Sequence, residues 1–302
     1  ALTITGTTTL TTSANDATIT LGTDSNAFTG AMTITTNDAS GTDADVTIDG
    51  GTTALVIAAS TVDGDLALRT GNASGITDTG TVTVGGNFTA TTDANNGVIT
   101  LDSMAVDGTF TLAPNNTGAV TIVNDAGLAL AASTMGGTFS GTATTGDITD
   151  SGALAITGAA TFITGATGSN IILDHASNAF SNSVELKADT GGNEAFGNIT
   201  FIDSAAVDFD SSASANGDLF INGSTDGAVG GNLNVTATTG NITQNVALAI
   251  TGTTTLTTSA NDATITLGTD SNAFTGAMTI TTNDAAGTDA DVTIDGGTTA
   301  LV

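Results

Sequence analysis

Residues 1–56 of this 302-residue chain recur almost unchanged as residues 247–302. The two blocks differ at only two positions, Thr3 against Ala249 and Ser40 against Ala286. A weaker internal repeat relates residues 137–186 to residues 231–280. Self-similarity at a fixed period is typical of solenoids and repeat arrays, in which each unit buries its apolar face on the next. We therefore expect residues 1–302 to form one continuous solenoid segment.

Short runs of alternating apolar and polar residues, separated by Gly, Asn, Asp and Thr, continue along the chain; examples are Leu233 with Val235 and Ile265 with Leu267. Alternation at period two indicates strands, and the separating residues indicate turns. Residues that favour helices are scarce, since Glu occurs twice and Lys and Arg once each. Hydrophobic residues make up 39% of the chain, and their regular spacing is unlike that of disordered tracts. The sequence therefore predicts an all-β protein.

The strand candidates are short for a β-sandwich. Three such strands with their corners make a coil of about 20 residues, which predicts a parallel β-helix, or β-solenoid. The alternative is a string of tandem Ig-like β-sandwiches, because the offset of the weaker repeat is about the size of such a domain. The absence of Trp and Tyr and the single proline, Pro114, count against sandwiches.

One asparagine position allows the coil length to be checked. Asn15 recurs at Asn37, and the second copy repeats the pair at Asn261 and Asn283. If the interval from Asn15 to Asn37 is one coil, these side chains stack at a corner and their amides bond along the axis. The alternative is that Asn-Asp pairs are simply common in turns, and the sequence leaves both interpretations open.

The charge of the chain restricts its partners. Two cationic side chains against thirty acidic ones give a net charge of −28. Nucleic acid and anionic membrane surfaces are therefore excluded as ligands, whereas divalent cations, basic surfaces and uncharged glycans remain open. No apolar run is long enough to span a membrane, so we expect no membrane insertion of this segment. The absence of cysteine rules out disulfides.

Aspartates are the candidate metal ligands, because one histidine and no cysteine cannot make a site of the usual His/Cys kind. Calcium takes carboxylate oxygens, and the motif GTDADVTIDGG and its copy supply six candidates: Asp43, Asp45, Asp49, Asp289, Asp291 and Asp295. The motif lacks the Gly-Gly-x-Gly-x-Asp nonapeptide of calcium-binding β-rolls. We favour a solvated acidic face that keeps the chain soluble, with calcium as the alternative and no other cofactor.

Paired carboxylates also serve glycoside hydrolysis, so acids two residues apart need consideration. If they lie in strands, the members of each pair share one face; the pairs are Asp43 with Asp45, Asp63 with Asp65, and Asp208 with Asp210. A lyase would need a cationic base, and the chain has only Arg69 and Lys187. We interpret both as isolated surface residues, Lys187 on one strand face with Glu185. The chain is therefore predicted not to be an enzyme.

His175 is the only histidine, with Asp174 before it and Ser177 after it. Adjacency in sequence is not the geometry of a catalytic triad, and no nucleophile-elbow motif is present. In the parallel block the position is Thr269, a turn residue, so we expect a solvated turn histidine.

Residues 231–258 have the repeat sequence GNLNVTATTGNITQNVALAITGTTTLTT, and residues 137–164 have a looser version of it. It resembles the repeats of filamentous-haemagglutinin-like large exoproteins and autotransporter-type passengers. The resemblance implies a right-handed parallel β-helix, export across a Gram-negative outer membrane, and a place at the bacterial cell surface or outside the cell. The matched motif is structural, so it transfers no functional residue.

Three functions are consistent with these features. The first is an extracellular fibre or adhesin shaft without catalysis, built from tandem repeats or by end-to-end self-association of the same chain. The second is an adhesin module that binds a glycan or a cell-surface receptor on its strand faces. The third, which we place last, is a carbohydrate-active enzyme on the same scaffold.

Overall fold

A computed structural model gives the fold. It describes residues 1–37, 44–188, 196–223, 225–269, 271–285 and 289–302. Strands, turns and bends make up the described residues, and none of their segments is a helix long and apolar enough to cross a membrane. The chain divides into two compact units, Ala1–Gly141 and Thr142–Val302, and strand β18 (Phe139–Ala143) spans the boundary. One continuous segment over residues 1–302 stays a prediction, and each unit is described by itself below.

The strands of the first unit are two to eight residues long. They are β1 (Thr3–Ile4), β2 (Thr8–Thr11), β3 (Ile19–Leu21), β4 (Ala27–Phe28), β5 (Met32–Thr35), β6 (Val46–Asp49), β7 (Leu55–Ile57), β8 (Ser60–Val62), β9 (Leu66–Thr70), β10 (Ile76–Asp78), β11 (Val82–Val84), β12 (Phe88–Thr92), β13 (Ile99–Val106), β14 (Phe110–Ala113), β15 (Val120–Asn124), β16 (Leu128–Leu130) and β17 (Ser133–Met135).

The strands of the second unit cover the same range of lengths. They are β19 (Ile148–Asp150), β20 (Leu154–Ile156), β21 (Ala160–Thr164), β22 (Ile171–Leu173), β23 (Ala179–Phe180), β24 (Val184–Ala188), β25 (Ile199–Asp203), β26 (Val207–Asp210), β27 (Asp218–Asn222), β28 (Ala228–Val229), β29 (Leu233–Ala237), β30 (Ile242–Gln244), β31 (Ala249–Ile250), β32 (Thr254–Asn261), β33 (Ile265–Leu267), β34 (Ala273–Phe274), β35 (Met278–Asn283) and β36 (Val292–Ile294).

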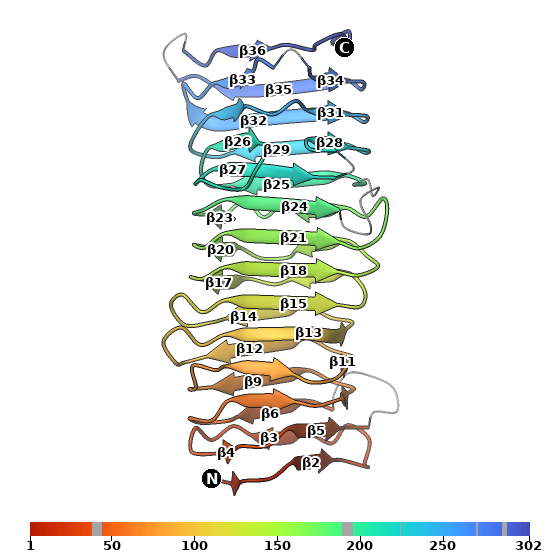
Figure 1. The fold of residues 1–302 in the computed structure, drawn as a ribbon, viewed down its shortest axis with the longest axis vertical. Helices are drawn as coiled ribbons and strands as arrows, with labels where there is room; N and C mark the ends of the chain where they lie inside the picture. The colour runs from red at the N-terminus through yellow and green to blue at the C-terminus, as the bar shows by residue number, and fades with distance from the viewer. Residues whose placement is uncertain (38–43, 189–195, 224, 270, 286–288) are drawn as a thin grey trace. The chain divides into compact units, whose positions relative to one another are not determined.

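Strands of the first unit stack in parallel from one coil to the next (Figure 1). One sheet runs β3-β6-β9-β12-β14-β16, and a second contains β2, β5, β8, β11, β13 and β15 in that order. Leu66 pairs with Val46 in the coil before it and with Phe88 in the coil after it. The fold is a right-handed parallel β-helix, as the sequence and its resemblance predicted, with successive turns ~22 residues apart. Parallel ladders exclude the alternative of Ig-like sandwiches, whose sheets are antiparallel.

The second unit has the same parallel architecture with one irregularity. One sheet runs β19-β22-β25-β29-β32-β35, and the other contains β21-β24-β27-β26-β30-β33-β36. Strands β26 and β27 are consecutive in the chain yet lie side by side in the same sheet, with Asp208 opposite Asp218. A parallel connection usually needs a dozen or more residues, whereas residues 211–217 make this one. The coil from Ile199 to its partner Leu233 is lengthened accordingly.

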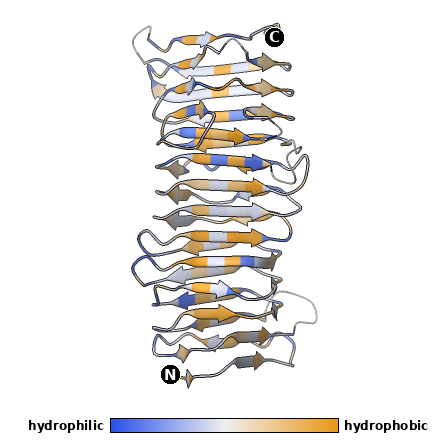
Figure 2. Cartoon of the chain, viewed as in Figure 1, coloured by the Kyte–Doolittle hydropathy of each residue, from blue (hydrophilic) through white to orange (hydrophobic). Residues whose placement is uncertain are grey.

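Hydrophobic residues recur along the strands (Figure 2), and those that are buried form the core of each unit. Strands such as β12 and β21 are buried at every second residue. Phenylalanines that are scattered in the sequence stack between coils: the ring centroids of Phe88 and Phe110 are 5.7 Å apart, and those of Phe180 and Phe201 are 5.1 Å apart. Each coil therefore covers the apolar face of its neighbour, which is why short strands suffice.

Side chains at one corner of the first unit bond each coil to the next. Asp45 Oδ1 accepts a hydrogen bond from Asp65 N at 2.8 Å. Asp65 Oδ1 accepts from Asn87 N at 2.6 Å, and Asn87 Oδ1 accepts from Thr109 N at 3.0 Å. These bonds give an acceptor to backbone N–H groups near the start of the strands, which would otherwise lack a partner.

The second unit has the same corner ladder. Asn170 Oδ1 accepts from Asn198 N at 2.6 Å, and Asn198 Oδ1 accepts from Asn232 N at 2.9 Å. Glycine precedes Asn198 and Asn232 because the coils approach closely: a Cβ on Gly231 would lie 2.3 Å from the carbonyl oxygen of Gly197. The repeated Gly-Asn pair before an apolar residue is thus a device for stacking coils.

Of the two interpretations of the recurring asparagines, the structure shows the ladder. Asn37 Nδ2 donates to Asn15 Oδ1 at 2.6 Å, and Asn283 Nδ2 donates to Asn261 Oδ1 at 2.8 Å. Both bonds join residues 22 positions apart on the surface. Each ladder links adjacent coils within its unit.

The repeated motif Ser-Asn-Ala-Phe places a buried asparagine between coils. Asn26, Asn178 and Asn272 are at most 3% exposed. Asn26 Oδ1 accepts from Leu2 N at 2.8 Å, and Asn272 Oδ1 accepts from Leu248 N at 2.9 Å. These amides join coils in the interior, where an unpaired N–H would be costly.

Candidate functional site

In the first copy of the proposed calcium motif, aspartate side chains accept hydrogen bonds from backbone N–H groups. The Asp45 side chain is the first rung of the corner ladder described above. Asp49 is 5% exposed, and its Oδ1 accepts from Gly51 N at 2.7 Å. Asp43 lies outside the described residues.

In the second copy, Asp295 repeats the backbone contact of Asp49. Asp295 Oδ1 accepts from Gly297 N at 2.7 Å, and Asp289 and Asp291 are exposed. Within the described residues, neither copy forms a group of three acids whose oxygens lie within 4.8 Å of one another. The solvated acidic face stays the favoured prediction for these aspartates, with calcium binding as the alternative.

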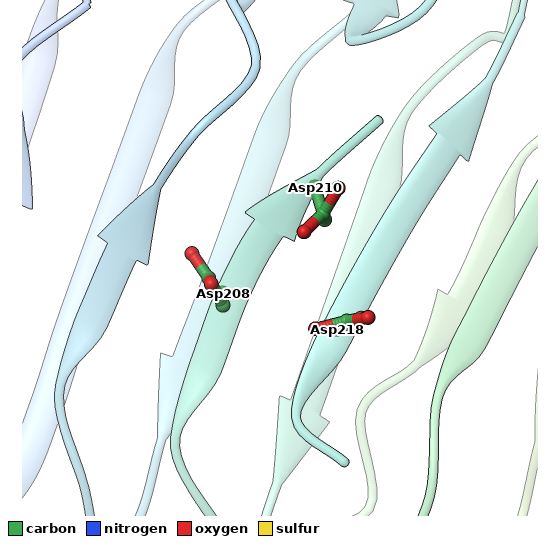
Figure 3. A group of neighbouring side chains, drawn as sticks. All are labelled: Asp208, Asp210 and Asp218. Atoms are coloured by element: carbon green, nitrogen blue, oxygen red, sulfur yellow. The ribbon is translucent and has the colours of Figure 1, made fainter. Parts of the chain in front are cut away.

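Carboxylates do converge on β26 and β27. Ligand oxygens of Asp208, Asp210 and Asp218 all lie within 4.8 Å of one another (Figure 3). Asp208 and Asp210 alternate with buried Val207 and Phe209 and therefore share the outer face of β26, as the sequence predicted for this pair. The pair predicted at Asp63 and Asp65 differs, because these residues lie in the turn between β8 and β9 rather than in a strand. We call Asp208, Asp210 and Asp218 the acidic triad.

Hydrogen bonds already engage every member of the acidic triad. Asp218 is 6% exposed, and its Oδ2 accepts from Ser214 N at 3.0 Å, which closes the loop between the two strands. Asp208 Oδ1 accepts from Thr243 Oγ1 at 2.8 Å. Asn245 donates to Asp210 Oδ2 at 2.6 Å, and this bond lowers the pKa of the Asp210 carboxyl.

Sequence reasoning found Asp208 and Asp210 but missed Asp218. The three acids meet because β26 and β27 pair with each other, although the interval from Asp208 to Asp218 is well short of a full coil. The sequence signalled only a turn before Asp218, through the serine-rich residues 211–216 and Gly217. In the structure Gly217 has φ of +89°.

Calcium is expected to leave the melting temperature of the second unit unchanged at millimolar concentration. Calcium requires six to eight oxygen ligands, and the triad carboxylates already hold the loop and the neighbouring strand. Differential scanning calorimetry with calcium and with a chelator measures this. A rise in melting temperature with calcium that Asp208→Asn abolishes would contradict the expectation and locate a site.

A shallow groove lies on the outer face of the first unit, over β6, β9 and β12. Its volume is about 210 Å³, and its lining includes Thr47, Ala67, Arg69, Thr89 and Thr91. This is smaller than the usual pocket for a drug-sized ligand. Its polar side chains are threonine hydroxyls, the Arg69 guanidinium and the largely buried Asp49 carboxylate.

The prediction that Arg69 is isolated is wrong. Arg69 Nε lies 2.6 Å from Asp93 Oδ2 and 3.9 Å from Asp49 Oδ2. Arg69 Nη2 also donates to Asp93 Oδ1 at 3.1 Å, so the pair is bidentate. Strand alternation points Arg69 outward, and stacking of the coils brings acids from both neighbouring coils beside it. Lys187 on β24 is not isolated either, and Glu185 accepts from Asn222 Nδ2 at 2.8 Å.

His175 is half-buried and lies just before a turn, whereas the sequence predicted a solvated histidine in the turn itself. Its Nδ1 accepts from the backbone N–H of Ser177 at 3.2 Å. Its own backbone N–H donates to Asp150 Oδ2 at 3.3 Å. The contacts of the imidazole are therefore those of a turn residue.

Asp203→Asn is expected to raise the melting temperature at neutral pH by about 1–3 °C. Burial raises the pKa of Asp203, although its Oδ1 accepts from Phe180 N at 3.0 Å. Suppose that the pKa of a carboxyl is higher in the folded state than in the unfolded state. The group then stabilises the fold below its unfolded pKa of about 3.9, and this stabilisation is lost as pH rises through the folded pKa. Asparagine keeps one acceptor oxygen for the Phe180 N–H and has no charge to bury.

Thermal unfolding of both proteins from pH 3 to pH 8 tests this expectation. The two melting temperatures should agree near pH 3, where Asp203 is protonated in both states, and separate as pH rises. A wild-type chain that gains stability relative to the variant on the same rise in pH would show that the carboxylate is favoured in the fold.

These features define a β-solenoid repeat protein whose recurring polar residues bond one coil to the next. The chain belongs to the family of repeats of unknown function, DUF5649, whose model matches residues 1–35, 43–115, 117–187 and 196–281. No curated protein and no solved structure gives a significant match.

Proposed function

We propose that the chain is a structural segment of an extracellular bacterial fibre or adhesin shaft and that it has no catalytic role. The observation that carries the proposal is the corner ladder. Contacts between coils involve the residues that recur in the sequence, namely the glycine, asparagine and apolar positions of GNLNV. A chain whose repeated positions all serve stacking is suited to extension along an axis.

Two further features support a surface location. The net charge of −28 disfavours lateral association of like chains and keeps an extended protein soluble. The repeat resembles those of filamentous-haemagglutinin-like exoproteins, which implies export across an outer membrane. The lack of cysteine agrees with passage through a pore as an unfolded chain.

Immunogold electron microscopy of the source bacterium tests the proposal. An antibody raised against this segment should label fibres or the outer surface of intact cells, and brief treatment with a broad-specificity protease should remove the label. Label found only after the cells are permeabilised would contradict the proposed location. Trypsin is unsuitable for this experiment because the segment has cleavage points only after Arg69 and Lys187.

The groove beside Arg69 favours a second candidate, a glycan- or receptor-binding module. Glycan-array binding by the chain would support it. The matched variants are Arg69→Gln and Lys187→Gln, since each removes one of the two cations and only Arg69 lines the groove. Binding lost in the first variant and kept in the second would assign the activity to the groove. Depolymerisation of the bound glycan would instead favour the carbohydrate-active enzyme.

A further inference from the structure

Glu185, Lys187 and Asn222 lie together on the outer face of two neighbouring strands of the second unit. Strand β24 pairs in parallel with β27 (Figure 1), and their register places Lys187 beside Asn222. Asn222 Nδ2 donates to Glu185 Oε1 at 2.8 Å. Leu186 and Ile221 point into the core, whereas the three polar residues are half-buried on the opposite face. An amine, a carboxamide and a carboxylate are therefore adjacent.

The residue types of this cluster are unusual for the chain. Lys187 is the only lysine, and Glu185 is one of two glutamates. At the offset of the weaker internal repeat, their counterparts are Thr279 and Thr281. Glutamate and lysine are depleted in strands, where threonine is enriched, so strand propensity does not account for the exchange. The exchange occurs on the strand that receives β27, the additional strand of the lengthened coil.

We propose that Lys187 and Asn222 form an intramolecular isopeptide bond, with Glu185 as the group that moves the protons. Glu185 accepts a proton from the Lys187 ammonium, and the neutral Nζ attacks Asn222 Cγ. The bond between Nζ and Cγ forms, the bond between Cγ and Nδ2 breaks, and Glu185 returns the proton to Nδ2, which leaves as ammonia. The released ammonia takes up the second proton that Nζ loses and departs as ammonium. No electron is transferred, and no co-reactant is needed.

Strand pairing brings the reacting groups within reach of each other. Neighbouring strands are about 4.8 Å apart, a separation that the flexible four-carbon stem of lysine spans. Holding both groups on paired strands supplies the proximity that attack on an unreactive amide needs. The Glu185 carboxylate already contacts the nitrogen that has to leave. Ile163 pairs with Lys187 and Phe220 pairs with Glu185, and such apolar neighbours limit the access of competing water.

The cross-link acts where the stacking of coils is irregular. Strand β27 lies between β24 and β26, and residues 211–217 make its short connection to β26. A bond from residue 187 to residue 222 closes the intervening chain into a loop, which restricts the unfolded state as other covalent clips do. The chain has no cysteine, so a disulfide cannot take this role. The additional strand is thereby fixed to the coil before it.

Intact-mass spectrometry of the full chain tests the proposal. We expect the purified protein to be lighter than its sequence by one molecule of ammonia, and a protease digest to contain one peptide pair joined through Lys187 and Asn222. Cyclisation of Asn222 with Gly223 to a succinimide loses the same mass, but it needs no lysine. Lys187→Arg should therefore restore the full mass. A wild-type chain of full sequence mass, or a loss of ammonia that persists in Lys187→Arg, overturns the proposal.

Glu185→Gln tests the proton transfer. Glutamine keeps an acceptor for Asn222 Nδ2 but cannot take up a proton, so freshly synthesised chains should lose ammonia about a hundredfold more slowly or less. Asp208→Asn is the matched control, because it removes a carboxylate from the same sheet but not from the cluster. Cross-linking at the wild-type rate in Glu185→Gln would refute the role of Glu185. The mass of the chain does not depend on its location, so the cross-link and the proposed shaft are tested separately.

Discussion

Gly75→Ala is expected to destabilise the first unit by about 3 kcal/mol or more, among the largest effects of any single substitution in the chain. Gly75 has φ of +71°, a conformation that costs an alanine about 1–2 kcal/mol. A Cβ there would also lie 1.7 Å from the carbonyl oxygen of Val98. That oxygen cannot withdraw freely, because it accepts the hydrogen bond of Ile76 N from the neighbouring coil at 3.0 Å.

Gly168→Ala separates the two causes. Gly168 has φ of +79°, but a Cβ there would meet no atom within 4 Å. The variant should therefore lose only the conformational part, about 1–2 kcal/mol. Urea unfolding followed by circular dichroism measures both losses. Equal losses would mean that the contact between coils at Gly75 relaxes without cost.

Sequence periodicity was sufficient to predict the architecture. Alternation at period two is a local property, so strands such as β29 are visible as Leu233 and Val235. The spacing of Asn15 and Asn37 was compatible with one coil or with two unrelated turns, and their amide bond shows that it is one coil. In a solenoid, contacts between neighbouring coils repeat at a nearly constant offset, which makes them readable from one sequence.

The acidic triad could not be predicted, because it depends on an exception to that periodicity. Asp218 meets Asp208 only because β27 enters the same sheet as β26. The alternation of apolar and polar residues over 207–222 does not indicate that two successive strands share a sheet. The role of Asp45 was missed for a related reason: an acid before a strand has the same pattern whether it binds a cation or the backbone N–H of the next coil.

Asn178→Ala is expected to destabilise the second unit by about 2–4 kcal/mol, because it leaves buried groups without partners. Asn178 is fully buried, and its Oδ1 accepts from Leu154 N at 2.9 Å. Its Nδ2 donates to Asp150 Oδ2 at 2.7 Å. Alanine can neither accept nor donate, and the Leu154 N–H cannot reach water in the interior.

The matched control is Asn283→Ala, which removes an amide of the same kind from the surface ladder. Water can replace the lost bond with Asn261, so the loss should stay within about 0.5 kcal/mol. Urea unfolding of both variants compares the two positions, and native-state hydrogen exchange at Leu154 reports the local effect. Equal losses would mean that the buried amide of the Ser-Asn-Ala-Phe motif contributes no more than a surface rung. In that case the backbone ladders and the apolar stack would hold adjacent coils together without a measurable contribution from the buried amide.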